Sequence, residues 1–167
     1  MPTRLFIDGA AGTTGLEIRE RLQGRSEFDL IILDDAQRKS EAARRALGLP
    51  PSGRLVLVVG GSQGATRLNR WVEDNLEEFA VRGVHVLCLT GPGGREDEVR
   101  SPQSVVKFLP FCHQMAAAYS AADLAVARAG AGTLAELATC RTPAVLIPLP
   151  SAADDHQTAN ARESERT

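Results

Sequence analysis

The stretch VLVVGGSQGATRLN, residues 56–69, decides the fold of this chain. Four apolar residues lead into a glycine-rich turn, and a helical pattern from Thr66 to Phe79 follows, with Leu68 and Val72 on its apolar stripe. A buried strand that passes through a glycine turn into a helix is typical of parallel α/β proteins. Because the turn aims free helix N–H groups at one point, it predicts a bound anion.

The same alternation of strand and helix runs along the whole chain, as short apolar segments between turn residues. The predicted strands are Arg4–Asp8, Asp29–Leu33, Leu55–Val59, Val84–Leu89, Val105–Phe108, Leu124–Ala127 and Ala144–Ile147. The predicted helices are Gly15–Leu22, Ser40–Leu47, Thr66–Phe79, Gln114–Ala121 and Thr133–Thr139. The fold class is therefore α/β, with a doubly wound, mostly parallel, Rossmann-like sheet that has helices on both faces.

The composition excludes several classes of protein. With 167 residues, 43% of them apolar, the chain is long enough for one domain with a substantial core. A net charge of −2 gives no support for nucleic-acid binding, and no apolar run reaches the roughly 18 residues of a membrane span. The cysteines, Cys88, Cys112 and Cys140, are too far apart for a zinc site and odd in number. We therefore expect no metal, no disulfide framework, no signal peptide before the strand at Arg4, and a cytoplasmic location.

A second glycine-rich turn lies near the start, in FIDGAAGTTGLEIRERL, residues 6–22. Glycines at this spacing after a strand let the backbone approach a pyrophosphate. Asp34 and Asp35 lie where an acidic residue would bind a ribose, whereas Arg38 and Lys39 favour the 2′-phosphate of NADP. A tight turn that binds nothing is the alternative. The candidate NADP-binding residues are Gly9, Gly12, Thr13, Thr14 and Gly15.

The segment FIDGAAGTTGLEIRERLQGRSEFDLIILDDAQRKSEAARRA resembles the amino terminus of the short-type N-acetyl-γ-glutamyl-phosphate reductases. The resemblance covers about Thr3–Ala46 and implies the beginning of an NADP site. It does not extend to the nucleophilic cysteine of that family, because none of the three cysteines lies in a matching context.

Two further loops carry groups that suit a nucleotide. Ser62 and Gln63 place polar side chains in the turn of the opening stretch. After the strand Leu124–Ala127, the backbone N–H groups of residues 131–133 begin a helix and can bind a phosphate. Glu136 follows one turn later and has two acceptor oxygens for the two hydroxyls of a ribose. The alternative for Glu136 is a surface glutamate stabilised by the helix dipole.

From about Leu47 to Ala161 the chain resembles the nucleotide-binding half of the MurG family of peptidoglycan N-acetylglucosaminyltransferases. The stretches VLVVGGSQGATRLN and FLPFCHQMAAAYSAADLAVARAGAGTLAELATCRTPAVLIPLPSAADDHQTANA carry this resemblance. It implies UDP-GlcNAc as the ligand, with phosphate, uracil, ribose and sugar contacts in four places. The implied UDP-GlcNAc-binding residues are Ser62, Gln63, Gly64, Cys112 (through its backbone), Ala131, Gly132, Thr133, Glu136, Gln157 and Asn160. Arg128 is expected to give structural or electrostatic support.

These two resemblances lead to the interpretation that the chain is a recombined or designed chimera. Residues 1–46 and 47–167 would form one Rossmann-like domain, with the strands near Arg4 and Asp29 extending the sheet. The site would be vestigial, with no complete catalytic site, no catalytic residue and no required cofactor. The alternatives are an active UDP-GlcNAc-dependent glycosyltransferase and an NADP-binding module. The chain is expected to be a monomer or a domain-swapped dimer.

Overall fold

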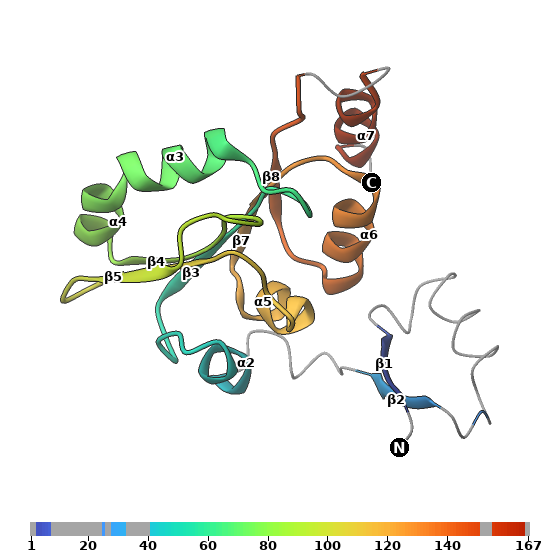
Figure 1. Ribbon diagram of the computed structural model, residues 1–167, viewed down its shortest axis with the longest axis horizontal. Helices are drawn as coiled ribbons and strands as arrows, with labels where there is room; N and C mark the ends of the chain where they lie inside the picture. Colours follow the sequence, from blue (N-terminus) through green and yellow to red (C-terminus); the bar gives the residue numbers. More distant parts are fainter. Residues whose placement is uncertain (1–2, 8–24, 26–27, 33–40, 151–154, 166–167) are drawn as a thin grey trace.

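The computed structural model describes residues 3–7, 25, 28–32, 41–150 and 155–165. From residue 41 onward, helices alternate with single strands or short runs of strands (Figure 1). The strands are β1 (Thr3–Ile7), β2 (Phe28–Ile32), β3 (Arg54–Val59), β4 (Val84–Leu89), β5 (Asp97–Arg100), β6 (Val105–Leu109), β7 (Leu124–Ala127) and β8 (Ala144–Leu146). The helices are α2 (Glu41–Ala46), α3 (Thr66–Asp74), α4 (Leu76–Arg82), α5 (Met115–Ala121), α6 (Ala131–Cys140) and α7 (His156–Ser164).

Six strands form the main sheet, in the order β5-β6-β4-β3-β7-β8. All neighbouring strands run parallel except β5, which pairs antiparallel with β6. The chain builds outward from β3 through β4 to β6, and then returns to the other side of β3 for β7 and β8. The predicted fold class, a doubly wound and mostly parallel α/β sheet, is confirmed.

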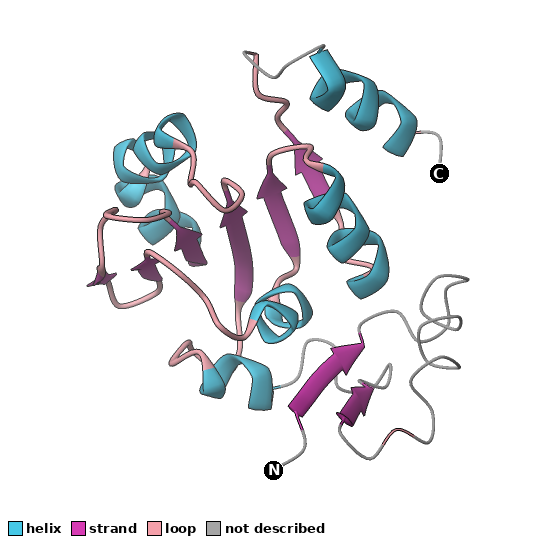
Figure 2. Cartoon of the chain, turned by 45° about the vertical axis from the view of Figure 1, so that its right-hand side comes forward, coloured by secondary structure: helices cyan, strands magenta, loops and turns pink. Residues whose placement is uncertain are grey.

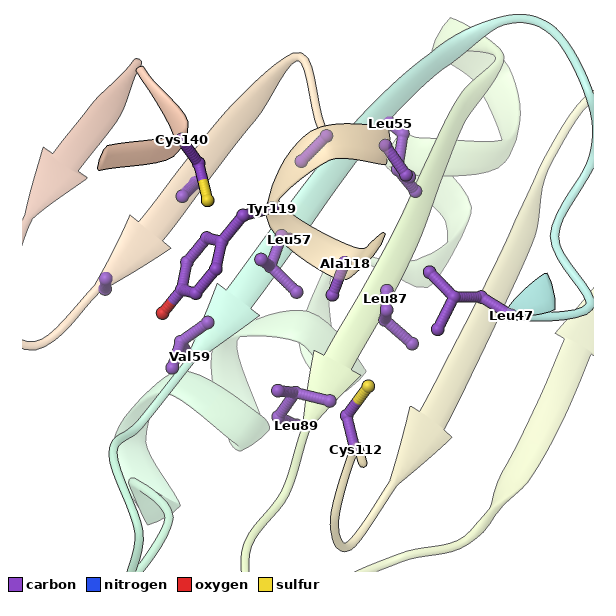
Figure 3. Packing of buried hydrophobic residues seen from close by; sticks show 14 of the residues in the cluster. Leu47, Leu55, Leu57, Val59, Leu87, Leu89, Cys112, Ala118, Tyr119 and Cys140 are labelled. Carbon is purple, nitrogen blue, oxygen red and sulfur yellow. The ribbon is translucent and has the colours of Figure 1, made fainter. Parts of the chain in front are cut away.

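Each face of the sheet has its own core because successive side chains of a strand point in opposite directions. Leu55, Leu57 and Val59 of β3 join the core under α2, α5 and α6, which also contains Tyr119 (Figure 3). Val58 faces the opposite core, under α3 and α4. Helices therefore cover both faces of the sheet, as Figure 2 shows.

The predicted helix over 66–79 is interrupted in the structure. The Asn75 side chain donates to the carbonyl oxygen of Trp71 at 2.7 Å, and the Asn75 backbone N–H bonds to Val72. An asparagine side chain that competes with its own backbone for the carbonyl four residues earlier ends a helix. The single predicted helix is therefore two helices, α3 and α4.

The first two strands do not extend the main sheet. β1 and β2 pair with each other in parallel, in register from Thr3 opposite Phe28 to Ile7 opposite Ile32, as a separate two-stranded sheet. The expectation that they continue the six-stranded sheet is wrong, because each of these strands provides the backbone hydrogen bonds of the other. At one edge of the main sheet β8 remains, with Ala144 and Val145 exposed.

A buried polar cluster lies at the amino end of the main strands. Arg44 of α2 is 5% exposed; it donates to the carbonyl oxygen of Gly53 at 2.8 Å and to Asp123 at 3.2 Å. Asp123 also accepts from the backbone N–H of Leu55 at 2.9 Å. These contacts attach α2 to the main sheet, so the residues from Glu41 onward pack with it.

His85, at the start of β4, belongs to the same end of the sheet and should make the stability of the protein depend on pH. Its Nδ1 accepts from the backbone N–H of Val105 at 3.1 Å. Burial lowers the pKa of His85, the charge of Arg44 lowers it further, and a backbone hydrogen bond at Ser52 opposes them. Because the folded pKa lies below that of the unfolded chain, near 6.5, the stabilisation is present above about pH 6.5 and is lost as the pH falls through the folded pKa.

We expect the free energy of unfolding to fall by up to about 1.4 kcal/mol per pH unit from this group below pH 6.5. Urea denaturation at pH 5.5, 6.0, 6.5 and 7.5 measures the effect. His85→Asn retains an acceptor for Val105 but does not titrate, and should flatten the curve. A variant with an unchanged pH profile would contradict the role of His85.

Candidate functional site

The site lies at the carboxyl ends of β3 and β7, on either side of the point where the strand order reverses. Ligands of open α/β sheets bind in the crevice at such a point, because the two flanking loops turn away in opposite directions. Here the flanking loops are residues 60–65, after β3, and 128–130, after β7. The backbone N–H of Arg128 donates to the carbonyl oxygen of Val59 at 3.1 Å, which holds the two loops together at their bases.

The loop after β3 needs its glycines for two different reasons. Gly61 has φ +83° and open space around it, so its requirement is conformational. Gly64 has φ +74° and is also crowded, since a Cβ there would overlap the carbonyl oxygen of Thr90. Gly91 shares this close approach: a Cβ on Gly91 would lie 2.6 Å from the Cα of Gly64. The loops after β3 and β4 are therefore packed backbone to backbone.

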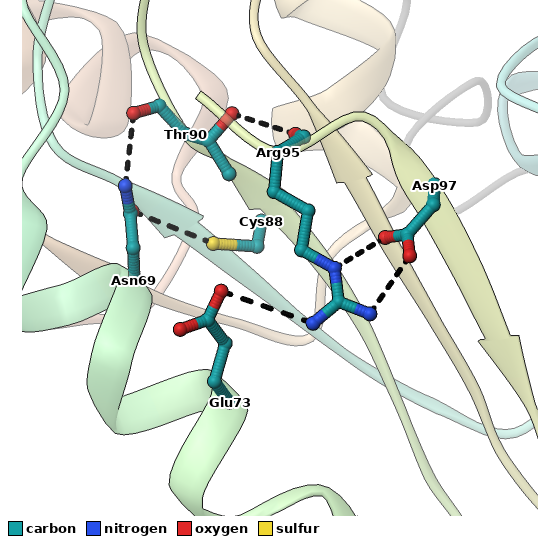
Figure 4. A network of polar contacts seen from close by, with 6 residues as sticks. All are labelled: Asn69, Glu73, Cys88, Thr90, Arg95 and Asp97. Atoms are coloured by element: carbon teal, nitrogen blue, oxygen red, sulfur yellow. Dashed lines mark hydrogen bonds and ion pairs between the residues drawn. The ribbon is translucent and has the colours of Figure 1, made fainter. Parts of the chain in front are cut away.

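A polar network fixes the second of these loops against α3 (Figure 4). Asn69 of α3 donates to the carbonyl oxygen of Thr90 at 2.9 Å, and the Thr90 hydroxyl donates to the carbonyl oxygen of Arg95 at 3.0 Å. Arg95 makes a bidentate pair with Asp97 and lies over the ring of Phe108, 4.2 Å from its centre. Burial raises the pKa of the neighbouring Cys88 to about 12, so this thiol is not a reactive group. The network therefore fixes the backbone at Thr90, against which Gly64 of the glycine loop packs.

A cavity of about 680 Å³ opens in front of the glycine loop. Its walls are the glycine loop 60–64, the first residues of α3, Arg128, the segment at Leu149 and Pro150, and Gln157 of α7. Of the predicted residues, Ser62, Gln63, Gly64 and Gln157 line this cavity together. It is of the size that small-molecule ligands occupy.

Two arginines give the cavity a positive charge. Arg128 is 7% exposed, and its Nη1 donates to the carbonyl oxygens of Ile147 at 3.0 Å and Pro148 at 2.9 Å. Its Nε is buried without a hydrogen-bond partner among the described residues. Burial lowers the pKa of Arg128, and the charge of Arg67 lowers it further. A buried donor and two neighbouring like charges would both be stabilised by an anion.

Arg67 and the segment at Leu149 and Pro150 were not predicted from the sequence. Arg67 follows Thr66, the first residue of α3, where a positive charge opposes the helix dipole. This position was a usable signal, because a basic residue at a helix start after a glycine turn suits a bound anion. Leu149 and Pro150 carry no comparable signal, and only the tertiary structure brings them to the cavity.

Helix α6 begins directly after the loop 128–130, but the first residues of this helix do not line the cavity. Gly130 precedes the helix, and added Cβ atoms on Gly130 or Gly132 would meet nothing within 4 Å, so this helix start is open. Glu136 is exposed, and its Oε2 accepts from the hydroxyl of Tyr119 at 2.8 Å. Ala131, Gly132, Thr133 and Glu136 therefore form a second group of predicted residues, separate from those that line the cavity.

The two predicted sugar-binding residues are engaged within the chain. Gln157 Oε1 accepts from the backbone N–H of Leu149 at 2.9 Å, and Asn160 donates to the carbonyl oxygen of Ala129 at 3.0 Å. Helix α7 buries none of its described residues, so these contacts hold it beside the loop after β7. Gln157 reaches the cavity, whereas Asn160 does not line it.

Cys112 lies on another loop, after β6. Its side chain is 6% exposed and points into the core beneath α5 (Figure 3). Burial raises the pKa of this thiol. Next to it, Phe111 is 65% exposed and contacts His113 edge to face, with ring centres 4.8 Å apart. The thiol is thus a core group, and only the backbone of Cys112 is left for the predicted contact with uracil.

The predicted NADP-binding residues, Gly9, Gly12, Thr13, Thr14 and Gly15, lie outside the described residues. Within the described ranges, no group of three or more histidine, cysteine or acidic side chains could hold a metal ion. No helix in the same ranges is both long and apolar enough to cross a membrane.

Comparison with known proteins identifies the relatives of this site. The glycosyltransferase family 28 C-terminal domain matches residues 55–167. The UDP-N-acetylglucosamine--N-acetylmuramyl-(pentapeptide) pyrophosphoryl-undecaprenol N-acetylglucosamine transferase of Opitutus terrae is 43% identical over 95% of this chain and 40% of its own length. The transferase of the same name from Nostoc punctiforme is 46% identical over 69% of this chain and 32% of its own length. The chain thus spans about two fifths or less of the length of these curated relatives.

A solved structure agrees with these sequences. The crystal structure of MurG from Acinetobacter baumannii superimposes with a TM-score of 0.56 and 29% identity, covering 97% of this chain and 50% of that chain. The six-stranded sheet and its helices therefore have the fold of half of that protein.

These comparisons correct the interpretation of the chain as a recombined or designed chimera with a vestigial site. The Opitutus terrae transferase aligns with 95% of the chain, so its similarity includes most of the segment 1–46 that we assigned to a reductase. A short strand, glycine turn and helix recur throughout parallel α/β folds, and such a unit does not by itself identify a family. The reductase assignment and the NADP-binding alternative receive no support from these relatives.

The family model, the curated relatives and the solved structure all point to the same family. Because the family model matches residues 55–167, which is more than half of this chain, the chain belongs to the glycosyltransferase family 28 C-terminal domain family.

Proposed function

We propose that this chain binds UDP-GlcNAc as the donor for an N-acetylglucosaminyltransferase of peptidoglycan synthesis. The names of its relatives describe an N-acetylglucosamine transferase that joins UDP-N-acetylglucosamine and an N-acetylmuramyl-(pentapeptide) pyrophosphoryl-undecaprenol. One observation carries the proposal. The glycine loop 60–64 and two arginines, Arg67 and Arg128, meet in one cavity at the switch point of the sheet. A nucleoside diphosphate sugar combines the anion, the polar sugar and the size that this cavity suits.

The diphosphate is the part of the donor that we assign to the cavity. Ser62 and Gln63 offer polar side chains, and Gly64 allows the loop backbone to approach the phosphates. Arg128 has a free Nε for a phosphate oxygen. When the sugar is transferred, the departing UDP gains negative charge. The two arginines would stabilise that charge in the transition state as well as in the complex.

The nucleoside is assigned to the neighbouring loops. Glu136 would accept hydrogen bonds from the two ribose hydroxyls. The N–H groups of residues 131–133 would point at the phosphate nearest the ribose, at the end of the diphosphate that extends beyond the cavity. The backbone at Cys112 would bind the edge of the uracil. These assignments follow from the resemblance, supported by the open start of α6 and the exposure of Glu136.

The sugar is assigned to Gln157 and Asn160. In each side-chain amide, one of the two polar atoms is hydrogen-bonded to the backbone, and the other is left for a ligand. Gln157 keeps its amide NH₂ for a sugar hydroxyl, and Asn160 keeps its carbonyl oxygen. We assign no catalytic base to this chain, and no metal or other cofactor. We place the reaction in the cytoplasm, in keeping with the buried cysteines Cys88, Cys112 and Cys140, which form no disulfide among the described residues.

Calorimetric titration of the purified chain with UDP-GlcNAc tests the proposal, with NADP and UDP as parallel ligands. We expect saturable binding of UDP-GlcNAc and UDP and none of NADP. Binding of NADP alone, or of no ligand, would overturn the proposed function.

Glu136→Ala should weaken UDP binding by about a hundredfold or more, since two hydrogen bonds to a charged acceptor are lost, each worth about 1.5–3 kcal/mol. Glu77→Ala is the matched control, because Glu77 is also an exposed helical glutamate but lies on α4, against the opposite face of the sheet. Titrations of both variants with UDP measure the difference. Equal affinities of the two variants would contradict the ribose assignment.

A further inference from the structure

We infer that Tyr119 is a positioning residue, which holds the carboxylate of Glu136 in the orientation that accepts the ribose of the donor. The inference rests on the proposed function of the same site. Nothing in the sequence pattern distinguishes Tyr119 from the apolar residues around it in α5, and only the structure brings it to Glu136.

The ring of Tyr119 is fixed by the core. The residue is 1% exposed and packs beneath α6, next to Leu57 and Cys140 (Figure 3). The hydroxyl of Thr142 donates to the Tyr119 backbone carbonyl oxygen at 3.1 Å, which secures the end of α5. Since neither ring nor backbone has room to move, the phenol hydroxyl is a rigid donor.

This hydroxyl reaches from the core to an exposed side chain. It donates to Oε2 of Glu136 at 2.8 Å, across the contact between α5 and α6. Burial raises the pKa of Tyr119 above its ordinary value, and the Glu136 carboxylate raises it further. The phenol therefore keeps its proton over the physiological range and always acts as the donor of this bond.

The hydrogen bond from Tyr119 would hold the Glu136 carboxylate in the orientation that binds the two ribose hydroxyls. A glutamate on a helix surface has several rotamers, and a ligand that needs one of them must restrict the others. Tyr119 uses one lone pair of Oε2, so Oε1 and the second lone pair of Oε2 remain free for the two ribose hydroxyls. The carboxylate is then oriented before the nucleotide binds, and the affinity gained should appear only with ligands that carry these hydroxyls.

Tyr119→Phe removes the hydroxyl and keeps the ring, so it separates positioning from packing. We expect this variant to bind UDP about three- to tenfold more weakly than the unmodified chain. It should bind 2′,3′-dideoxy-UDP with unchanged affinity, because that ligand offers Glu136 no hydroxyl. In the Glu136→Ala background, Tyr119→Phe should cause no further loss of UDP affinity, since its effect passes through that carboxylate.

Thr142→Val is the matched control. It removes the hydrogen bond that the Thr142 hydroxyl donates to the carbonyl oxygen of Tyr119, and it leaves the phenol in place. We expect it to lower the melting temperature without changing the ratio of the UDP and 2′,3′-dideoxy-UDP affinities. Calorimetry with both ligands and thermal unfolding of every variant provide the measurements.

Three results would overturn the inference. Equal weakening of both ligands by Tyr119→Phe would mean that the tyrosine only supports the fold. An unchanged UDP affinity in Tyr119→Phe, when Glu136→Ala binds weakly, would mean that the carboxylate needs no positioning. A complete lack of UDP binding by the unmodified chain would remove the proposed function itself, and the inference with it.

Discussion

Gly64→Ala is expected to lower the free energy of unfolding by roughly 3–5 kcal/mol. Two costs combine at this position. An alanine at φ +74° adopts a left-handed conformation that favours glycine, and its Cβ would overlap the carbonyl oxygen of Thr90. The obstacle is backbone, held by Asn69 from the other side, so it cannot move aside as a flexible side chain would. Urea denaturation of the variant measures the loss.

Gly61→Ala separates the two costs. Gly61 has a similar φ of +83°, but a Cβ there would meet nothing within 4 Å. This variant should lose only about 1–2 kcal/mol, the cost of the left-handed conformation alone. Equal losses in the two variants would contradict the packing of the loop after β3 against the loop after β4.

Arg128→Met should abolish measurable UDP-GlcNAc binding, a loss of at least a hundredfold if the guanidinium binds a phosphate and also holds the cavity wall. The substitution removes the charge and the free Nε, and it leaves the carbonyl oxygens of Ile147 and Pro148 without their donor. Titration with UDP-GlcNAc measures the affinity, and thermal unfolding confirms that the variant folds.

Two further substitutions define what Arg128 contributes. Arg70→Met, at an exposed arginine of α3 outside the cavity, should bind the donor normally. Arg128→Lys keeps a positive charge but has a single nitrogen, which cannot serve two carbonyl groups and a phosphate at once. We expect it to bind weakly, between the unmodified chain and Arg128→Met. Normal binding by Arg128→Met would contradict the assignment of the diphosphate to this cavity.

The sequence was sufficient to predict the architecture where local pattern and tertiary environment agree. Leu57 and Val58 point to opposite cores, and apolar residues on both sides of a strand identify it as a covered, parallel one. Strand β5 could not be predicted, because Asp97, Glu98 and Arg100 give it no apolar pattern and it forms only through pairing with β6. The break at Asn75 depends on a side-chain hydrogen bond that helical periodicity does not reveal.

The same distinction applies to the site. Glycine turns after strands have a local signature, so Ser62, Gln63 and Gly64 could be placed together from the sequence, and the cavity lies in front of them. Tyr119 could not be found in this way, since its partner Glu136 is 17 residues away on another helix. The double role of Arg128, which faces the cavity and holds the backbone at Ile147, also depends on contacts distant in sequence.

The buried ionic cluster around Arg44 and the glycine loops occupy opposite ends of the same strands. For protein engineering, this separation means that durability and ligand recognition can be adjusted independently. Substitutions at residues such as His85, at the amino end, would change how well the domain tolerates heat or acid. The sheet between the two ends would keep the loops around Ser62 in their present geometry. A variant with higher stability need not have a different ligand specificity.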